Sequence, residues 1–310
     1  MNIYKKTSPD MKVSELKTIT KNSWINLVNP TIKEIKEVVS KTNIDEDLLM
    51  KMLDEEELPR IEVSGKSTLI VIDIPVKSSN NKYKTYPLGI IISKDNFFVT
   101  ITLKKANIFD DFLNNKVRNF TTTKRTRFLI QILIRTATTY IRELNNINND
   151  IKSKEKILIK STGNKQLIDL LNIEKTLVYF ITSLKANDVV LEKLAKGSIF
   201  NIFEDDLDLL EDASIELKQA IDMSIIYRDI LSSITDTYAT IVSNNLNIAM
   251  KFLAGITIVF SIPTMISSFL GMNVPLGDFS KNEHSFIIIS LISTLIAIVI
   301  AYLLKKKDML

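Results

Sequence analysis

A series of small, hydroxyl-bearing and amide-bearing residues recurs toward the C-terminus at alternating spacings of three and four positions. This spacing is a heptad pattern, which places all members on one side of a helix. Their oxygen atoms could line a wet passage for a hard cation, which prefers oxygen ligands and retains its own waters. The alternative interpretation is close packing of membrane helices through small residues. The series is Ser233, Asp236, Thr240, Ser243, Asn247, Met250, Ala254, Thr257, Ser261, Thr264, Ser268 and Gly271.

Eight positions in or beside this row are candidates for lining the passage. Met250 and the adjacent Leu253 are apolar, and rings of such side chains can close a pore by excluding water. Asp236 is expected to face water or an ion, because a carboxylate packed without water is costly. The candidate lining residues are Asp236, Asn247, Met250, Leu253, Thr257, Ser261, Thr264 and Ser268.

Two uncharged apolar runs, Phe252–Leu270 and Phe286–Leu304, have 19 residues each. A helix needs roughly 20 residues to cross a hydrocarbon core of about 30 Å. Lysines flank the pair at positions 251 and 305–307, whereas the loop between the runs carries only Lys281. The positive-inside rule therefore predicts a multi-pass protein of the cell membrane, with both termini in the cytoplasm and residues 271–285 outside.

Helix signals dominate after the first hundred or so residues. No helix breaker separates Asp206 from the first apolar run, so we expect one helix from about Asp206 to Leu270, nearly 100 Å long. Two further long helices are expected, at about 124–159 and 165–195. A lone helix cannot enclose a passage, so the polar row implies a homo-oligomer with cyclic symmetry.

The patterns together predict an α+β fold in three parts. Residues 1–120 form a cytoplasmic α/β domain, residues 121–250 a cytoplasmic helical and stalk region, and residues 251–310 a transmembrane hairpin. Residues 78–84 are polar and are expected to form a mobile loop. The predicted strands, rich in β-branched and aromatic residues, are 24–27, 60–63, 67–75, 86–93 and 97–102, with short helices at 29–40 and 45–54.

Composition excludes several functions. The formal net charge is only +4 and no basic stripe with interleaved aromatic residues is present, so nucleic acid is not an expected partner. The chain has no cysteine and one histidine, His284, which argues against thiolate or histidine metal sites and against an enzyme. Ser64-Gly65-Lys66-Ser67 lacks the upstream glycine of a phosphate-binding loop. No organic cofactor is expected.

The tripeptide Gly271-Met272-Asn273 between two C-terminal spans, with a lysine-rich tail, resembles the CorA family of divalent-cation channels. Other segments fit the same family: 24–27 (WINL), 58–62 (LPRIE), 227–230 (YRDI) and 250–251 (MK). The resemblance implies a homopentameric cytoplasmic funnel, a pore lined by the long helix, and an outer span facing lipid. It also implies passive uptake of Mg²⁺, with Co²⁺ or Ni²⁺ tolerated and intracellular Mg²⁺ holding the pore shut.

Under this resemblance, Gly271, Met272 and Asn273 are expected to form the selectivity filter. The side-chain oxygen of Asn273 and the carbonyl of Gly271 would present neutral acceptors to a hydrated Mg²⁺, which gives up its waters reluctantly. The plainer interpretation is that Gly271 only caps the first span and Asn273 lies in the turn. The residue before the tripeptide, Leu270, departs from the aromatic residue that the family often has.

The family's regulatory pair of carboxylates falls near Asp212 and Lys51, and Lys51 is not a carboxylate. The segment Glu204–Glu216 carries seven acids and no base, which fits either Mg²⁺ ligands between protomers or a helix N-terminus favoured by its dipole. The acids one turn beyond Lys51 could substitute for it. The predicted regulatory ligands are Asp212, Glu211, Asp208, Asp54 and Glu55.

Two alternative functions stay open from the sequence. One is transport of another metal, such as Zn²⁺ by ZntB-type proteins, in which the middle residue of the tripeptide usually differs from Met272. The other is a membrane-anchored scaffold or sensor that passes no ion, although an anchor gains nothing from a polar heptad row.

Overall fold

The computed structural model describes the chain except for residues 78–82, 161–163, 198, 201, 273–283 and 308–310. The chain divides into two compact units, Met1–Ile234 and Thr235–Leu310. The first unit is an α+β unit built on one sheet, and the second consists of helix. The division expected from the sequence, at residues 120 and 250, stays a prediction.

The sheet of the first unit has seven strands in the order β2-β1-β3-β7-β6-β5-β4. All neighbours are antiparallel except β3 and β7, which run parallel. The sheet is therefore mixed, and a parallel pair needs a long crossover connection between its strands. The strands are β1 (Asn2–Lys5), β2 (Ser14–Leu16), β3 (Trp24–Val28), β4 (Arg60–Ser64), β5 (Ser67–Lys77), β6 (Tyr83–Ser93) and β7 (Phe98–Thr102).

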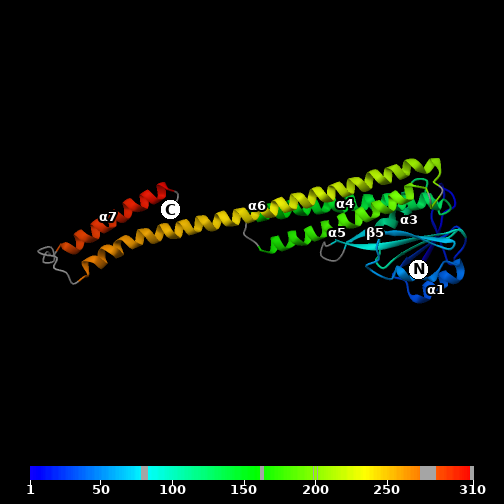
Figure 1. Cartoon of the computed structure of the whole chain (residues 1–310), viewed down its shortest axis with the longest axis horizontal. Coiled ribbons are helices and arrows are strands. Elements are labelled where there is room, and N and C mark those ends of the chain that lie inside the picture. Colours follow the sequence, from blue (N-terminus) through cyan, green and yellow to red (C-terminus); the bar gives the residue numbers. More distant parts are fainter. Residues whose placement is uncertain (78–82, 161–163, 198, 201, 273–283, 308–310) are drawn as a thin grey trace. The chain divides into compact units, whose positions relative to one another are not determined.

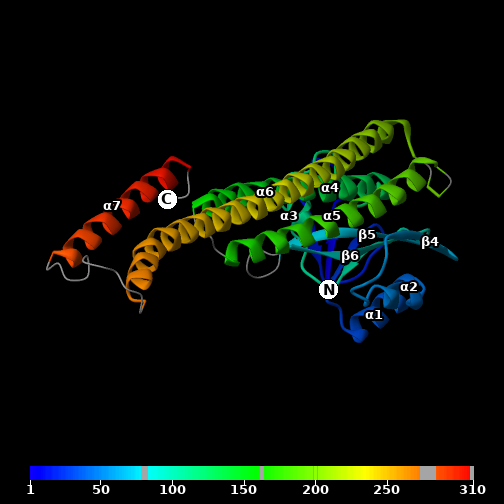
Figure 2. The same cartoon turned by 60° about the vertical axis from the view of Figure 1, so that its left-hand side comes forward.

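Helices cover both faces of this sheet. Figures 1 and 2 show α1 (Ile32–Thr42) and α2 (Glu46–Lys51) on one face, and α4 (Arg125–Lys160) and α5 (Asn164–Ala195) on the other. Two short helices, η2 (Asn107–Phe109) and α3 (Asp110–Leu113), follow β7. Apolar residues of β3, β5, β6 and β7 pack with α1 and α2 in one core cluster.

The start of α1 shows how local sequence sets an element. Thr31 caps the helix by accepting from the Glu34 amide, and the Glu34 side chain accepts from the Thr31 amide, which is a complete capping box. Asn43 ends the helix in a left-handed conformation with φ of 52°. These two caps explain why the turn at Asn29-Pro30-Thr31 predicted the helix well.

Two long helices complete the chain, α6 (Glu204–Leu270) and α7 (Ser285–Lys306). By length and composition, both could cross a membrane. The expectation of one uninterrupted helix through residue 270 is confirmed, and α6 has 67 residues.

The strand expectations are confirmed in place, with ends shifted by up to three residues. Strand β6 begins at Tyr83, so residues 83 and 84 belong to a strand and not to the expected loop, whereas 78–82 lie outside the described residues. The edge strand β2 and its neighbour β1 were missed, because they have three and four residues and little β-branched character.

Candidate functional site

The polar row predicted on α6 is exposed along its whole length. All twelve residues of the row, from Ser233 to Gly271, are exposed to solvent in the single chain. The covered residues in the last third of the helix lie elsewhere: buried Gly255 and half-buried Ile256, Val259, Ile262, Pro263, Ile266 and Leu270. At about 100° per residue, these positions centre on the side of α6 opposite the polar row. The covered side of the span therefore leaves the polar row exposed, together with apolar side chains such as Phe260 and Met265.

The hydroxyl groups in this row share one hydrogen-bonding arrangement. Thr257 Oγ1 donates to the Leu253 carbonyl at 2.8 Å, and Ser261 Oγ donates to the Thr257 carbonyl at 2.7 Å. Thr264 Oγ1 and Thr240 Oγ1 likewise donate four residues back, at 3.0 Å each. A hydroxyl has one donor and two acceptor lone pairs, so these groups use their proton within the helix and present acceptors outward.

Small side chains in the row leave a groove along the helix just before the span. It has a volume of about 510 Å³ and is lined by Ala239, Thr240, Ser243, Asn244 and Asn247. Met250 and Leu253 follow it with exposed side chains, 62% and 66% exposed. Along the row, the polar groove is therefore followed by the apolar side chains of Met250 and Leu253 and then by the hydroxyl groups that begin at Thr257.

The predicted filter begins where α6 ends. The Gly271 amide donates to the Ser267 carbonyl at 3.0 Å, and the Met272 side chain is exposed. The φ of Gly271 is not positive, so a left-handed cap does not explain this glycine. A Cβ at this position would lie 3.3 Å from the Ser267 carbonyl oxygen, which is a tight approach. Asn273, the third filter residue, lies outside the described residues.

The predicted regulatory acids are not brought together within one chain. Asp208, Glu211 and Asp212 are exposed on α6. Glu55 pairs instead with Lys104 at 3.1 Å, and Asp54 accepts from the Glu56 amide at 2.9 Å. Among the described residues, no group of three or more acidic or histidine side chains could hold a metal ion. A site built from these acids would need a second chain.

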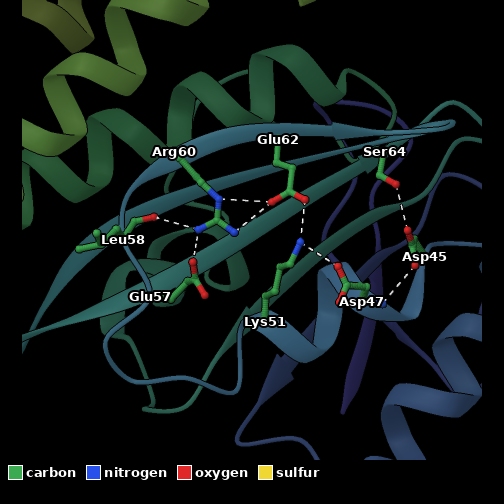
Figure 3. Close-up of polar contacts among 8 residues, drawn as sticks. All are labelled: Asp45, Asp47, Lys51, Glu57, Leu58, Arg60, Glu62 and Ser64. Carbon is green, nitrogen blue, oxygen red and sulfur yellow. Dashed lines mark hydrogen bonds and ion pairs between the residues drawn. The ribbon is translucent and has the colours of Figure 1, made fainter.

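Lys51 lies in a network of ion pairs, drawn in Figure 3. Its Nζ is 2.7 Å from both Asp47 Oδ2 and Glu62 Oε1. Arg60 joins Glu62, at 3.0 Å between Nη2 and Oε2, to Glu57. Hydrogen bonds from Lys51 and Arg60 lower the pKa of Glu62, and those to Asp47 and Glu62 raise the pKa of Lys51. At this position, the chain supplies its own cation.

The sequence analysis missed two features of α6, one inside the apolar span and one at the start of the helix. Pro263 lies inside α6, where its ring removes the amide that would bond the Val259 carbonyl. Arg127 and Asp206 form a buried ion pair of 2.5 Å that fastens the start of α6 to α4. The proline was visible in the sequence, but the ion pair joins residues 79 positions apart and has no local signal.

Comparison with known proteins gives consistent matches over nearly the whole chain. Residues 20–306 match the family model described as CorA-like Mg²⁺ transporter protein. The cobalt/magnesium transport protein CorA of Methanocaldococcus jannaschii is 27% identical over 293 residues, covering 92% of this chain and 90% of that protein.

Solved structures show the same similarity. The complete structure of the CorA magnesium transporter from Methanocaldococcus jannaschii matches with a TM-score of 0.85 at 26% identity, covering 97% of this chain and 96% of the other. The ZntB cytoplasmic domain from Vibrio parahaemolyticus covers 79% of this chain and 98% of its own, with a TM-score of 0.63 at 9% identity. The latter likeness shows a shared fold alone.

Proposed function

The chain belongs to the CorA family of Mg²⁺ transporters, and we propose that five copies form a channel that lets Mg²⁺ flow passively into the cytoplasm. The observation that carries this proposal is the uncovered row of oxygen acceptors on α6, which continues through an apolar span. A membrane helix loses favourable free energy by turning polar groups to lipid, so a row of this kind favours a wet interior. Five rows around one axis would enclose it.

The lining would suit a cation that keeps its water. Water molecules on Mg²⁺ point their hydrogens outward, and they need acceptors on the pore wall. Thr257, Ser261 and Thr264 offer such acceptors, because their own protons are held by helix carbonyls. Asn247 would add amide oxygens and Asp236 a ring of carboxylates below them.

The outer entrance would be the filter formed by Gly271, Met272 and Asn273. Asn273 would offer a neutral oxygen, which attracts the hydrated ion without trapping it as a carboxylate would. The bare backbone at Gly271 would leave its carbonyl open to the same ion. Ser268 would follow one turn inward, and Met250 with Leu253 would form the apolar gate that excludes water when closed.

Regulation would come from Mg²⁺ bound between neighbouring protomers. Asp208, Glu211 and Asp212 of one chain would face Asp54 and Glu55 of the next, because no single chain gathers them. Glu55 would have to exchange its exposed ion pair with Lys104 for the metal. Bound ions would cross-link the ring and hold it shut, and loss of the ions would loosen it. Lys51 would take no part, since its ammonium group already pairs with Asp47 and Glu62.

The proposed orientation follows the lysines beside the spans, with both termini in the cytoplasm of a cell membrane. A divalent ion entering down an inside-negative potential gains about 4.6 kcal/mol per 100 mV, twice the single-charge value of about 2.3. Uptake therefore needs no nucleotide hydrolysis and no organic cofactor. Co²⁺ and Ni²⁺ are further candidate ions.

The test is ion flux into liposomes that contain the purified full chain. We expect Mg²⁺ influx that rises with an inside-negative potential and is lost in Asn273→Ala. The matched control is Asn245→Ala, an exposed asparagine on α6 outside the polar row, which should conduct normally. Normal flux in Asn273→Ala would overturn the filter assignment.

The same assay separates the alternative functions. Zn²⁺ uptake that Mg²⁺ does not inhibit would favour a ZntB-type transporter. Absence of flux for Mg²⁺, Zn²⁺, Co²⁺ and Ni²⁺ would favour a non-transporting anchor or sensor. Mutual competition among Mg²⁺, Co²⁺ and Ni²⁺ is the result expected of the proposed channel.

A further inference from the structure

A cavity of about 460 Å³ lies in the first unit, away from the polar row. Its walls come from the end of β6, the start of α4 and the segment that leads into α6. Its apolar wall is formed by Ile92, Phe200 and Phe203. Phe203 is 68% exposed, so its ring is accessible to a ligand in the cavity. Small-molecule sites are typically cavities of about 300–1,000 Å³ with apolar walls and a few polar groups.

Cations also line the cavity. Lys124, Arg125 and Arg127 line it together with two carboxylates, Asp205 and Asp206. Arg127 is committed to Asp206 by the 2.5 Å ion pair. Among the ion pairs of the described residues, none involves Lys124 or Arg125. Two cations therefore face one remaining carboxylate, and the wall carries a net positive charge.

Arg125 is the more unusual of the two cations. Its guanidinium is half-buried and donates to the Ser93 carbonyl, and burial lowers the pKa of this arginine. A desolvated charge is normally retained only with a charged partner. The five donors of a guanidinium exceed what a single carbonyl accepts, so further donors remain for an anion.

The N-terminus of α4 adds to the positive potential near these cations. The chain places Lys124, Arg125 and Arg127 at the start of the 36-residue helix α4, and the first turn of α4 contains no acid. The positive end of a helix dipole disfavours cations and favours anions. The start of α6, by contrast, carries three acids in its first turn. The start of α6 thus carries the acids that a helix N-terminus favours, whereas the start of α4 carries cations and no acid.

We propose that this cavity binds a nucleoside phosphate, with the phosphate at Lys124 and Arg125 and the base against Phe200 and Phe203. Guanidinium and ammonium groups are the usual partners of phosphate, and aromatic side chains take the flat faces of bases. Inorganic phosphate could bind Lys124 and Arg125, but it would make no use of the aromatic side chains that line the cavity. The proposal concerns binding, and it stands independently of the proposed ion transport.

The experiment is isothermal titration of the full chain in detergent with ATP, and separately with inorganic phosphate, both in EDTA. EDTA removes divalent cations, so neither transport nor a regulatory metal can contribute to the signal. We expect saturable ATP binding, with phosphate weaker by about tenfold or more. Lys124→Gln should weaken ATP binding roughly tenfold, in line with a lost charged hydrogen bond. Phe203→Ala should weaken ATP but not phosphate.

Two variants guard against misfolding. Thr126→Glu puts a carboxylate on the cavity wall and an acid into the first turn of α4, which favours the helix, yet it should abolish binding. Lys152→Gln, an exposed lysine on the same helix outside the cavity, should bind like the unmodified chain. No ATP binding, undiminished binding in Thr126→Glu, or equal affinity for ATP and phosphate would each overturn the proposal.

Discussion

The buried pair of Arg127 and Asp206 offers a quantitative test of how the first unit is held together. The side chains are 11% and 4% exposed, and Arg127 also donates from Nη2 to the Asp205 carbonyl at 3.0 Å. Arg127→Met keeps most of the side-chain volume but leaves the Asp206 carboxylate buried without its partner. Removing one partner of such a pair costs about 3–5 kcal/mol.

That cost converts into a measurable shift. For a unit of 150–250 residues, 1 kcal/mol moves the midpoint of thermal unfolding by about 2–4 °C, so Arg127→Met should lower it by roughly 6–20 °C. The only tryptophan of the chain, Trp24, is fully buried in the first unit. Its fluorescence therefore follows this unit in the intact protein, without interference from the membrane helices.

Two further variants make the reasoning refutable. Arg228 and Asp229 form an exposed pair, so Arg228→Met should change stability by at most about 1 kcal/mol. The double variant Arg127→Met with Asp206→Leu removes both charges and should be far more stable than Arg127→Met alone. A double variant as unstable as the single one, or equal shifts in Arg127→Met and Arg228→Met, would refute the argument.

Three other perturbations follow from single contacts. Burial raises the pKa of Asp73 above its usual 3.8, and the hydrogen bond from Ser183 opposes that rise. The folded state therefore holds a proton that the unfolded state has already released. Stability falls as the pH rises from the unfolded pKa to the higher folded pKa of this group. Asp73→Asn should remove that fall when the unfolding temperature is measured at rising pH. Gly89→Ala would put a Cβ 2.6 Å from Met52 Cγ and 2.9 Å from Ile101 Cγ2 and should cost about 1–3 kcal/mol, as read by tryptophan fluorescence. Thr264→Val replaces an acceptor with a methyl group and should slow Mg²⁺ flux into liposomes without changing the unfolding temperature.

The membrane part of the fold was predictable because its signals are local. The two spans are long uninterrupted apolar runs, and the ends predicted for α6 and α7 lie within two residues of those observed. The polar row on α6 could be found for the same reason, since a heptad pattern needs only the sequence, and its role as a pore lining stays a prediction. Pro263 did not end the helix, although a proline removes one backbone hydrogen bond.

The first unit was less predictable because its contacts join distant segments. The pairing of β4 with β5 stops at Arg60 and Val71, which leaves the edge of β5 at Asp73 without a strand partner among the described residues. The Asn187 side chain pairs with this edge: it donates to the Asp73 carbonyl and accepts from the Asp73 amide, both at 2.8 Å. Tyr140 donates to the same carbonyl at 3.2 Å. An asparagine on α5 that completes a strand edge gives no periodic signal, so sequence patterns alone could not find it.

The distribution of carboxylates limits where a divalent cation could act on the first unit. Glu57 and Glu62 are held by Arg60 and Lys51, so a metal there would have to displace a protein cation. By contrast, no ion pair of the described residues involves Asp208 or Asp212. These two acids lie one turn apart and exposed on α6, and like charges at this spacing repel each other. A cation from solution relieves that repulsion, which is why the proposed regulatory Mg²⁺ belongs on α6 and not at Lys51.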